Sequence, residues 1–133
     1  MTTPYEVKVR RIYEEPLKTD GMRILVDRLW PRGLSKEKAH IDEWCKTVAP
    51  SPELRKWYGH DPALFEDFSR RYRGELQEPE PAAALDRLGD LARQGPLTLL
   101  TATREPGISE AAVLSTLIQE SLRRPGSGPE ASR

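Results

Sequence analysis

The sequence predicts an α/β fold in which a small, mostly parallel sheet is flanked by helices, forming one layered-sandwich domain. Two short apolar runs, 23–27 and 97–102, have the nearly unbroken hydrophobicity of strands that are buried on both faces. Amphipathic segments separate and follow these runs, and strands connected through helices usually pair in parallel. At 133 residues the chain has the length of one domain.

The first half of the chain carries strand signals followed by a helix signal. Residues 7–13 begin with alternating apolar and charged side chains, as expected of a half-exposed strand. The run 23–27 is then predicted to be a central strand. Ser35 is suited to cap a helix. The side chains that follow at i, i+3, i+4 and i+7 predict one helix with a buried stripe formed by Ile41, Trp44, Cys45 and Val48.

The second half predicts further helices around the strand at 97–102. Ser51-Pro52-Glu53 combines a cap, a proline and an early acid, and begins a brief helix that carries Leu54 and Trp57 inward. Two amphipathic helices follow before the strand, and Ser109 caps a last one.

The tail, 124–133, is rich in Gly, Pro and Ser and has no apolar anchor. We therefore expect it to be disordered and the single domain to comprise residues 1–123.

Composition restricts the partners and the compartment. Lys plus Arg and Asp plus Glu number 21 each, so the neutral chain does not favour nucleic acid, although a local basic patch would permit it. The single cysteine, Cys45, cannot form an internal disulfide. With no signal-peptide pattern and no long apolar run, we expect a cytoplasmic protein without a membrane segment. His40, His60 and Cys45 lack metal-ligand spacing, so neither a metal nor another cofactor is expected.

The predicted site lies where the two buried strands end. Sites in open α/β sheets form beyond the carboxyl ends of the strands, which here lead into 27–33 and 101–107. If the strands are neighbours, these two loops face each other across a crevice.

Asp27 and His60 are the candidate catalytic residues. Asp27 follows a buried strand, where a carboxylate can act as a base or orient a ligand; alternatively it caps the turn or pairs with Arg28. His60 stands in a Gly-His-Asp-Pro break and can transfer protons near neutral pH. Its alternative role is to order the entry to the next helix.

Arginines in the first loop are suited to recognise a phosphate or a carboxylate. Trp30-Pro31 restricts the backbone of this loop and would hold the flanking arginines in fixed directions; alternatively these arginines only lock the loop to the domain. The residues predicted to bind a small anionic molecule are Arg28, Trp30, Arg32, Trp57, Thr103 and Arg104.

Three linked segments, RILVDRLWPRG, SKEKAHIDEW and APSPELRKWYGHDP, resemble the YeaO-like family of small bacterial proteins, a domain of unknown function. The resemblance extends from about Val7 to Leu122 and implies a compact α/β domain with no established activity. The positions that match the family motif are Asp27, Arg28, Trp30, Pro31, Arg32, Gly33, Trp57, Gly59 and His60. Where relatives carry a His-Asn pair, this chain has Ile108-Ser109. If that pair helps to form the family's site, the resemblance implies altered or lost chemistry here.

These observations support three hypotheses. The first is an enzyme-like domain whose crevice binds a phosphate- or carboxylate-bearing small molecule, with His60 or Asp27 accepting a proton during hydrolysis or group transfer. The second is a non-catalytic module that uses an Arg/Trp surface to bind a protein or a nucleic acid. The third is a purely structural Asp–Arg–Trp cluster. The sequence does not set an oligomeric state.

Overall fold

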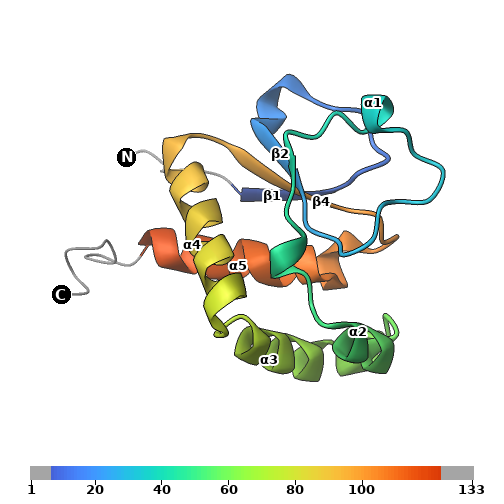
Figure 1. Cartoon of the computed structure of the whole chain (residues 1–133), viewed down its shortest axis with the longest axis vertical. Helices are drawn as coiled ribbons and strands as arrows, with labels where there is room; N and C mark the ends of the chain where they lie inside the picture. The colour runs from blue at the N-terminus through green and yellow to red at the C-terminus, as the bar shows by residue number, and fades with distance from the viewer. Residues whose placement is uncertain (1–6, 124–133) are drawn as a thin grey trace.

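A computed structural model describes residues 7–123 and confirms the α/β fold (Figure 1). Its sheet has four strands in the order β1-β4-β2-β3, and every pair of neighbours is parallel. The central strands β2 and β4 are neighbours, so their carboxyl ends open at the same edge, as the crevice hypothesis requires. The strand bounds are Val7–Arg11 for β1, Met22–Leu25 for β2, Glu43–Trp44 for β3 and Leu97–Thr101 for β4.

Five α-helices and four 3-10 segments connect the strands within residues 7–123. The α-helices are α1 (Lys36–Ala39), α2 (Pro52–Tyr58), α3 (Phe65–Glu75), α4 (Pro79–Gln94) and α5 (Glu110–Arg123). The 3-10 segments are η1 (Lys18–Asp20), η2 (Lys46–Val48), η3 (Pro62–Leu64) and η4 (Pro106–Ile108). None of these helices is long and apolar enough to cross a membrane.

The two faces of the sheet are covered differently. Helices α4 and α5 pack on one face, while α2 and α3 extend the same core beyond the sheet (Figure 1). Because neighbouring strand residues point to opposite faces, Ile24 and Leu99 join this larger core, whereas Leu25 and Leu100 join a smaller one. The smaller core is covered mainly by irregular chain and α1, and Trp30 and Trp44 pack against it.

The predicted helix between Ser35 and Val48 is wrong. Ser35 does cap α1, but the helix ends after one turn at His40, whose backbone is left-handed with φ 50°. The chain then forms β3, where Trp44 pairs with Leu25, and the Cys45 amide donates to the Leu25 carbonyl at 2.8 Å. The open edge of β2 thus supplies backbone partners that override the helical spacing of the side chains.

Most of the other predicted elements are confirmed. Ser51 caps α2 by accepting a hydrogen bond from the Leu54 amide, and Ser109 accepts one from the Ala111 amide at the start of α5. Leu54 is buried as predicted, but Trp57 remains 38% exposed, so the prediction that it points inward is wrong. Tyr58 is instead the buried aromatic side chain of this helix, 4% exposed. The predicted disorder at 124–133 lies outside the described residues.

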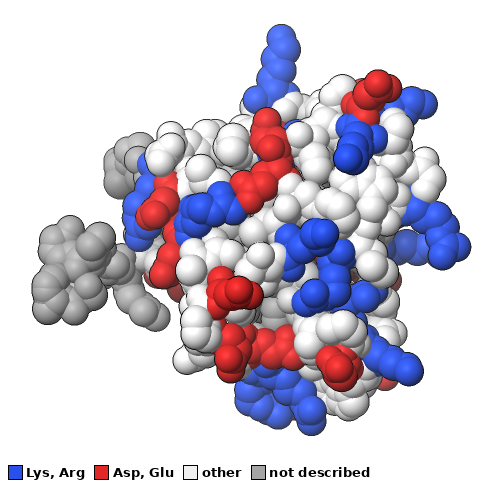
Figure 2. All heavy atoms as spheres, viewed as in Figure 1, with Lys and Arg blue, Asp and Glu red and all other residues white. Residues whose placement is uncertain are grey.

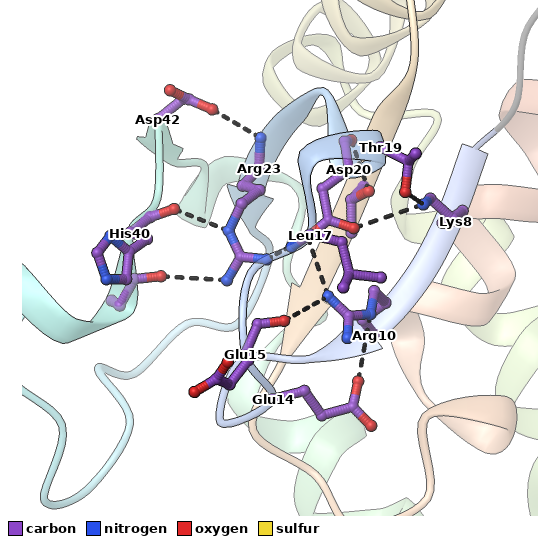
Figure 3. Close-up of polar contacts among 12 residues, drawn as sticks. Lys8, Arg10, Glu14, Glu15, Leu17, Thr19, Asp20, Arg23, His40 and Asp42 are labelled. Carbon is purple, nitrogen blue, oxygen red and sulfur yellow. Dashed lines mark hydrogen bonds and ion pairs between the residues drawn. The ribbon is translucent and has the colours of Figure 1, made fainter.

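A buried ionic cluster fixes the amino end of the sheet (Figure 3). Asp20 is fully buried and accepts hydrogen bonds from Arg23 at 2.6 Å and Arg10 at 2.9 Å. Arg23 also donates to the carbonyls of Ala39 and His40, which attaches α1 to β2. Burial alone would raise the pKa of Asp20, but the Leu17 amide and the two arginines lower it overall.

Gly21 is required beside this cluster. Its φ is 66°, and a Cβ placed there would lie 2.2 Å from the carbonyl oxygen of Pro96. The same carbonyl accepts the hydrogen bond of the Met22 amide that begins the pairing of β2 with β4. A side chain at position 21 would therefore push the two central strands apart.

Candidate functional site

The candidate site forms at the carboxyl ends of β2 and β4, where Asp27 connects the two strands. One oxygen of its carboxylate accepts a hydrogen bond from the Thr101 hydroxyl at 2.8 Å, and the other accepts one from the Ala102 amide at 2.8 Å. The backbone carbonyl of Asp27 accepts a hydrogen bond from Trp44 Nε1 at 2.7 Å. Asp27 therefore bonds to β4 and not to Arg28, its neighbour in sequence.

Glu110, the first residue of α5, meets Asp27 from the opposite side. Its carboxyl group lies next to the Asp27 carboxyl. Desolvation, followed by the interaction with the neighbouring Asp27 carboxyl, raises the pKa of Glu110 well above its usual value. Two neighbouring carboxyl groups repel each other when both are ionised, so this position favours the protonated form of Glu110.

Sequence reasoning did not find Glu110. An acid in the first turn of a helix, directly after a serine cap, is the ordinary pattern of a helix start. This local pattern accounts for Glu110 as an ordinary helix-start residue, so nothing near it in the sequence pointed to a site. Only the fold, which brings the start of α5 next to Asp27, identifies it.

A pocket of about 400 Å³ opens beside this carboxyl pair. We refer to it as the α2–α5 pocket. It is lined by Pro50, Pro52, Arg55, Lys56, Tyr58, His60, Phe68, Ser109 and Glu110. The pocket is therefore bordered by three basic side chains from α2 and the loop after it, Arg55, Lys56 and His60, and by one acid from α5, Glu110.

His60 lies on the rim of this pocket in a constrained backbone conformation. It follows Gly59 at the end of α2, and its φ of 58° is left-handed. Its Nδ1 is 3.4 Å from the Thr103 hydroxyl, a long contact that brings the loop after α2 to the loop after β4. The ring is exposed and lies 5.9 Å from the ring of Tyr58.

Tyr58 closes the inner wall of the pocket. Its hydroxyl donates to the Ile108 carbonyl at 2.6 Å, which attaches α2 to the segment that precedes α5. Burial raises the pKa of Tyr58 to about 12, and the nearby acids Asp61, Glu105 and Glu110 add to this effect. Tyr58 is therefore a neutral structural donor throughout the physiological pH range.

The other predicted binding residues lie in different places. Arg28 is half-buried and donates to the carbonyls of Ala49 and Pro50, and it lines a different pocket. Trp30 donates to the Leu34 carbonyl and packs edge-on against Trp44 at 5.2 Å between ring centroids.

The remaining three are exposed. Trp57 lies under the guanidinium of Arg71 at 4.3 Å. The backbone carbonyl of Arg32 accepts a hydrogen bond from the Tyr13 hydroxyl. Arg104 lies in the loop after β4. Of the predicted site residues, only His60 lines the α2–α5 pocket. Thr103 contacts His60, and Asp27 lies next to the lining residue Glu110. The other predicted residues, Arg28, Trp30, Arg32, Trp57 and Arg104, are not among those that line this pocket.

The donor set of the site does not suit a metal. Between Val7 and Arg123 there is no group of three or more His, Cys, Asp or Glu side chains that could hold an ion. Cys45 is buried, and burial, aided by the charge of Glu43, raises the pKa of its thiol. This residue is therefore a poor thiolate.

Comparisons with known proteins identify the relatives of this chain. A family model described as "Inactive DUF488-N3 subclade" matches residues 6–133. Uncharacterized proteins of Mycobacterium tuberculosis (strain H37Rv) and Mycobacterium bovis are each 45% identical over 118 residues, covering 89% of this chain and 98% of theirs. The uncharacterized protein YeaO of Escherichia coli is 39% identical over 109 residues, covering 82% of this chain and 93% of its own. No solved structure matches.

Proposed function

This chain belongs to the YeaO-like DUF488-N3i family, and from the geometry of its site we propose that it binds a small anionic molecule in the α2–α5 pocket without converting it. The ligand class is a molecule that carries a phosphate or a carboxylate. The observation that carries this proposal is the placement of Arg55, Lys56 and His60 around a pocket whose one lining acid is Glu110.

The electrostatics of the pocket favour an anion. Arg55 and Lys56 are exposed in the last turn of α2, so their charges are available to a ligand at the rim. Glu110 would repel an anion if it were ionised, but its raised pKa favours the neutral form. Arginine matches the oxygens of phosphate and carboxylate groups, and a lysine adds a mobile charge.

Three features support binding without turnover. Both oxygens of Asp27 already accept hydrogen bonds, from the Thr101 hydroxyl and the Ala102 amide, so the carboxylate is engaged within the fold. Ser109 uses its hydroxyl to donate to the Pro106 carbonyl and to cap α5, so it is not a free nucleophile. The family description as an inactive subclade points in the same direction.

Hydrolysis or group transfer is a second candidate function, and one observation favours it. Asp27 and Glu110 place two carboxyl groups next to each other, an arrangement in which one can act as base and the other as acid. His60, on the rim of the same pocket, would be the third proton-transfer group.

We also infer a cytoplasmic location, because the single cysteine is free and buried and offers no partner for an internal disulfide.

A thermal-shift screen tests the proposal. The wild-type protein is screened against phosphate- and carboxylate-bearing metabolites, because a ligand that binds only the folded state raises the melting temperature. We expect at least one such compound to raise it by several degrees. The shift should disappear in Arg55→Gln/Lys56→Gln, and the compound should be recovered chemically unchanged after incubation.

Lys36→Gln is the matched control for this screen, because Lys36 is an exposed cation on α1, away from the pocket. It should leave the ligand-induced shift intact. A panel without effect, or a shift that is equal in the double variant, contradicts anion binding at this site. Recovery of a converted compound would instead favour the second candidate.

A further inference from the structure

A second and larger pocket lies on the other side of the segment 49–52. Its volume is about 540 Å³, and we refer to it as the η2–α4 pocket. It is lined by Arg28, Lys46, Thr47, Ala49, Ser51, Tyr72, Glu75, Leu76, Glu78, Glu80 and Pro81. Alternate residues of the segment face the two pockets: Ala49 and Ser51 line this one, whereas Pro50 and Pro52 line the α2–α5 pocket.

This pocket contains charges of both signs that do not neutralise one another. Five charged residues line it, and within residues 7–123 none of them forms an ion pair. Figure 2 shows acidic side chains gathered over the start of α4 and basic side chains on the side of η2. Opposite charges on two walls of one pocket are the arrangement that a dipolar ligand would satisfy.

The basic wall is held in place by its own contacts. The Nε and Nη2 atoms of Arg28 donate to the carbonyls of Ala49 and Pro50. Its Nη1 makes no hydrogen bond to another described residue and is free to donate to a ligand. The ammonium of Lys46 lies 4.5 Å from the centroid of the Trp44 ring, which keeps this charge near the pocket.

On the acidic wall, one carboxylate is hydrogen-bonded within the fold, and the other two can bind a ligand. Glu75 accepts hydrogen bonds from the amide and the hydroxyl of Ser51 at 2.8 and 2.6 Å. Glu78 is the N-cap residue of α4 but makes no side-chain capping bond, and Glu80 lies in the first turn of α4. Both are exposed. Glu78 and Glu80 are therefore the groups that can receive a cation.

We propose that the η2–α4 pocket binds a small zwitterion of the amino-acid class, with its carboxylate towards Arg28 and Lys46 and its ammonium towards Glu78 and Glu80. A simple anion would be attracted by one wall and repelled by the other, and so would a simple cation. Between the walls, Leu76 and Pro81 offer apolar surface to the carbon chain of such a ligand. A volume of about 540 Å³ is within the range of small-molecule sites.

A series of ω-amino acids is the direct probe of this site. Glycine, β-alanine, 4-aminobutanoate and 6-aminohexanoate carry the same two charges at increasing separation, and the n-alkylamines and carboxylic acids of equal chain length are the single-charge controls. Binding is followed by two-dimensional amide NMR at low and at physiological salt. We expect one length of zwitterion to bind at least about tenfold more tightly than either matched control, with shifts confined to residues around the pocket.

Two charge-removing variants test the orientation. Lys46→Gln, which leaves Arg28 in place, should lower the zwitterion's affinity towards that of the alkylamine, and Glu78→Gln/Glu80→Gln should bring it down to that of the carboxylic acid. Lys56→Gln, in the other pocket, is the control and should change nothing. The proposal fails if no member of the series binds, if a single-charge compound binds as well as the zwitterion, or if the pocket variants bind like wild type.

This site is independent of the α2–α5 pocket. Arg28→Ala is not used as a test, because loss of its bonds to Ala49 and Pro50 would loosen the segment that separates the two pockets. Failure of the zwitterion series would leave the response of the α2–α5 pocket to anions unaffected, and the converse also holds.

Discussion

Strand β2 has an aspartate two residues before its start and another two residues after its end, and the two have opposite surroundings. Asp20 is surrounded by cations: Arg10, Arg23 and the ammonium of Lys8 at 3.5 Å. Asp27 receives hydrogen bonds from neutral donors of β4 and faces a second acid, Glu110. The amino end of the sheet therefore neutralises its buried charge, whereas the carboxyl end keeps two acids in contact.

This difference separates stability from function within one small domain. A cluster in which a buried carboxylate is paired with cations serves to fix the strands and α1. Two acids held next to each other beside a pocket lower the free energy of unfolding. Such destabilising arrangements are common at sites that bind ligands or catalyse reactions.

The largest effect is expected for Asp20→Asn. The substitution keeps the shape but leaves Arg23 buried, 5% exposed, without a carboxylate, and breaking one side of a buried ion pair costs about 3–5 kcal/mol of unfolding free energy. Urea denaturation measures it. Asp67→Asn is the control: Asp67 bonds Arg70 at the same three-residue spacing and at 2.7 Å, but both side chains are exposed, so we expect a loss below about 1 kcal/mol. Equal losses would contradict the assignment of Asp20 as the fixing charge.

Two threonines of β4 give a closer test, because each donates to one of the aspartates. Thr98 donates to the backbone carbonyl of Asp20 at 2.7 Å, and Thr101 donates to the carboxylate of Asp27 at 2.8 Å. Both are buried. Thr98→Val removes a bond between neutral groups and should cost about 1 kcal/mol, while Thr101→Val removes one to a charged group and should cost about 1.5–3 kcal/mol. A larger loss for Thr98→Val in urea denaturation would show that Asp27 does not depend on β4.

Glu110→Gln should stabilise the protein at neutral pH and change its pH dependence. The pKa of Glu110 is raised in the fold, so its contribution to stability is full below about pH 4.5, the ordinary value, and is lost as the pH rises towards the folded pKa. Glutamine donates to Asp27 without titrating, so the falling limb should flatten and the free energy of unfolding at neutral pH should increase by at least about 0.5 kcal/mol. Asp20 has the opposite pH dependence: because its pKa is lowered in the fold, its contribution to stability is present above about pH 3.8 and is lost as the pH falls below that value. Denaturation between pH 4 and 8 that is parallel in wild type and variant would refute the carboxyl pair.

The parts of the molecule that the sequence predicted are those with local causes. The runs that became β2 and β4 were recognisable by continuous hydrophobicity, and Ser51 and Ser109 by the residues that follow them. The region of β3 was mistaken for a helix because its helical spacing was visible, whereas the open edge of β2 beside it was not.

For the site, sequence reasoning located the carboxyl edge but not its electrostatics. Asp27 and Glu110 are 83 positions apart, and Arg10 and Asp20 lie on separate elements, so neither contact has a local pattern. Ligand roles for Asp27, His60 and the arginines stay predictions.

The smallest effect, and the one that most directly separates the two ends, concerns the two histidines. Both have a left-handed backbone, with φ of 50° at His40 and 58° at His60. His40 belongs to the amino-end cluster through its carbonyl, which accepts a hydrogen bond from Arg23, whereas His60 lines the α2–α5 pocket. Asparagine tolerates this conformation better than most residues, so His40→Asn and His60→Asn should each change the free energy of unfolding by no more than about 0.5 kcal/mol.

Binding should then distinguish two substitutions that are alike in stability. Because the imidazole of His60 borders the pocket, we expect His60→Asn to weaken binding of the anionic ligand found by the thermal-shift screen severalfold, as measured by calorimetry. His40→Asn should bind like wild type, because its backbone carbonyl, the group that serves the cluster, is unchanged. Should both variants bind like wild type, His60 would be only the residue that ends α2. Should both weaken binding equally, the loss would come from the backbone and not from the imidazole.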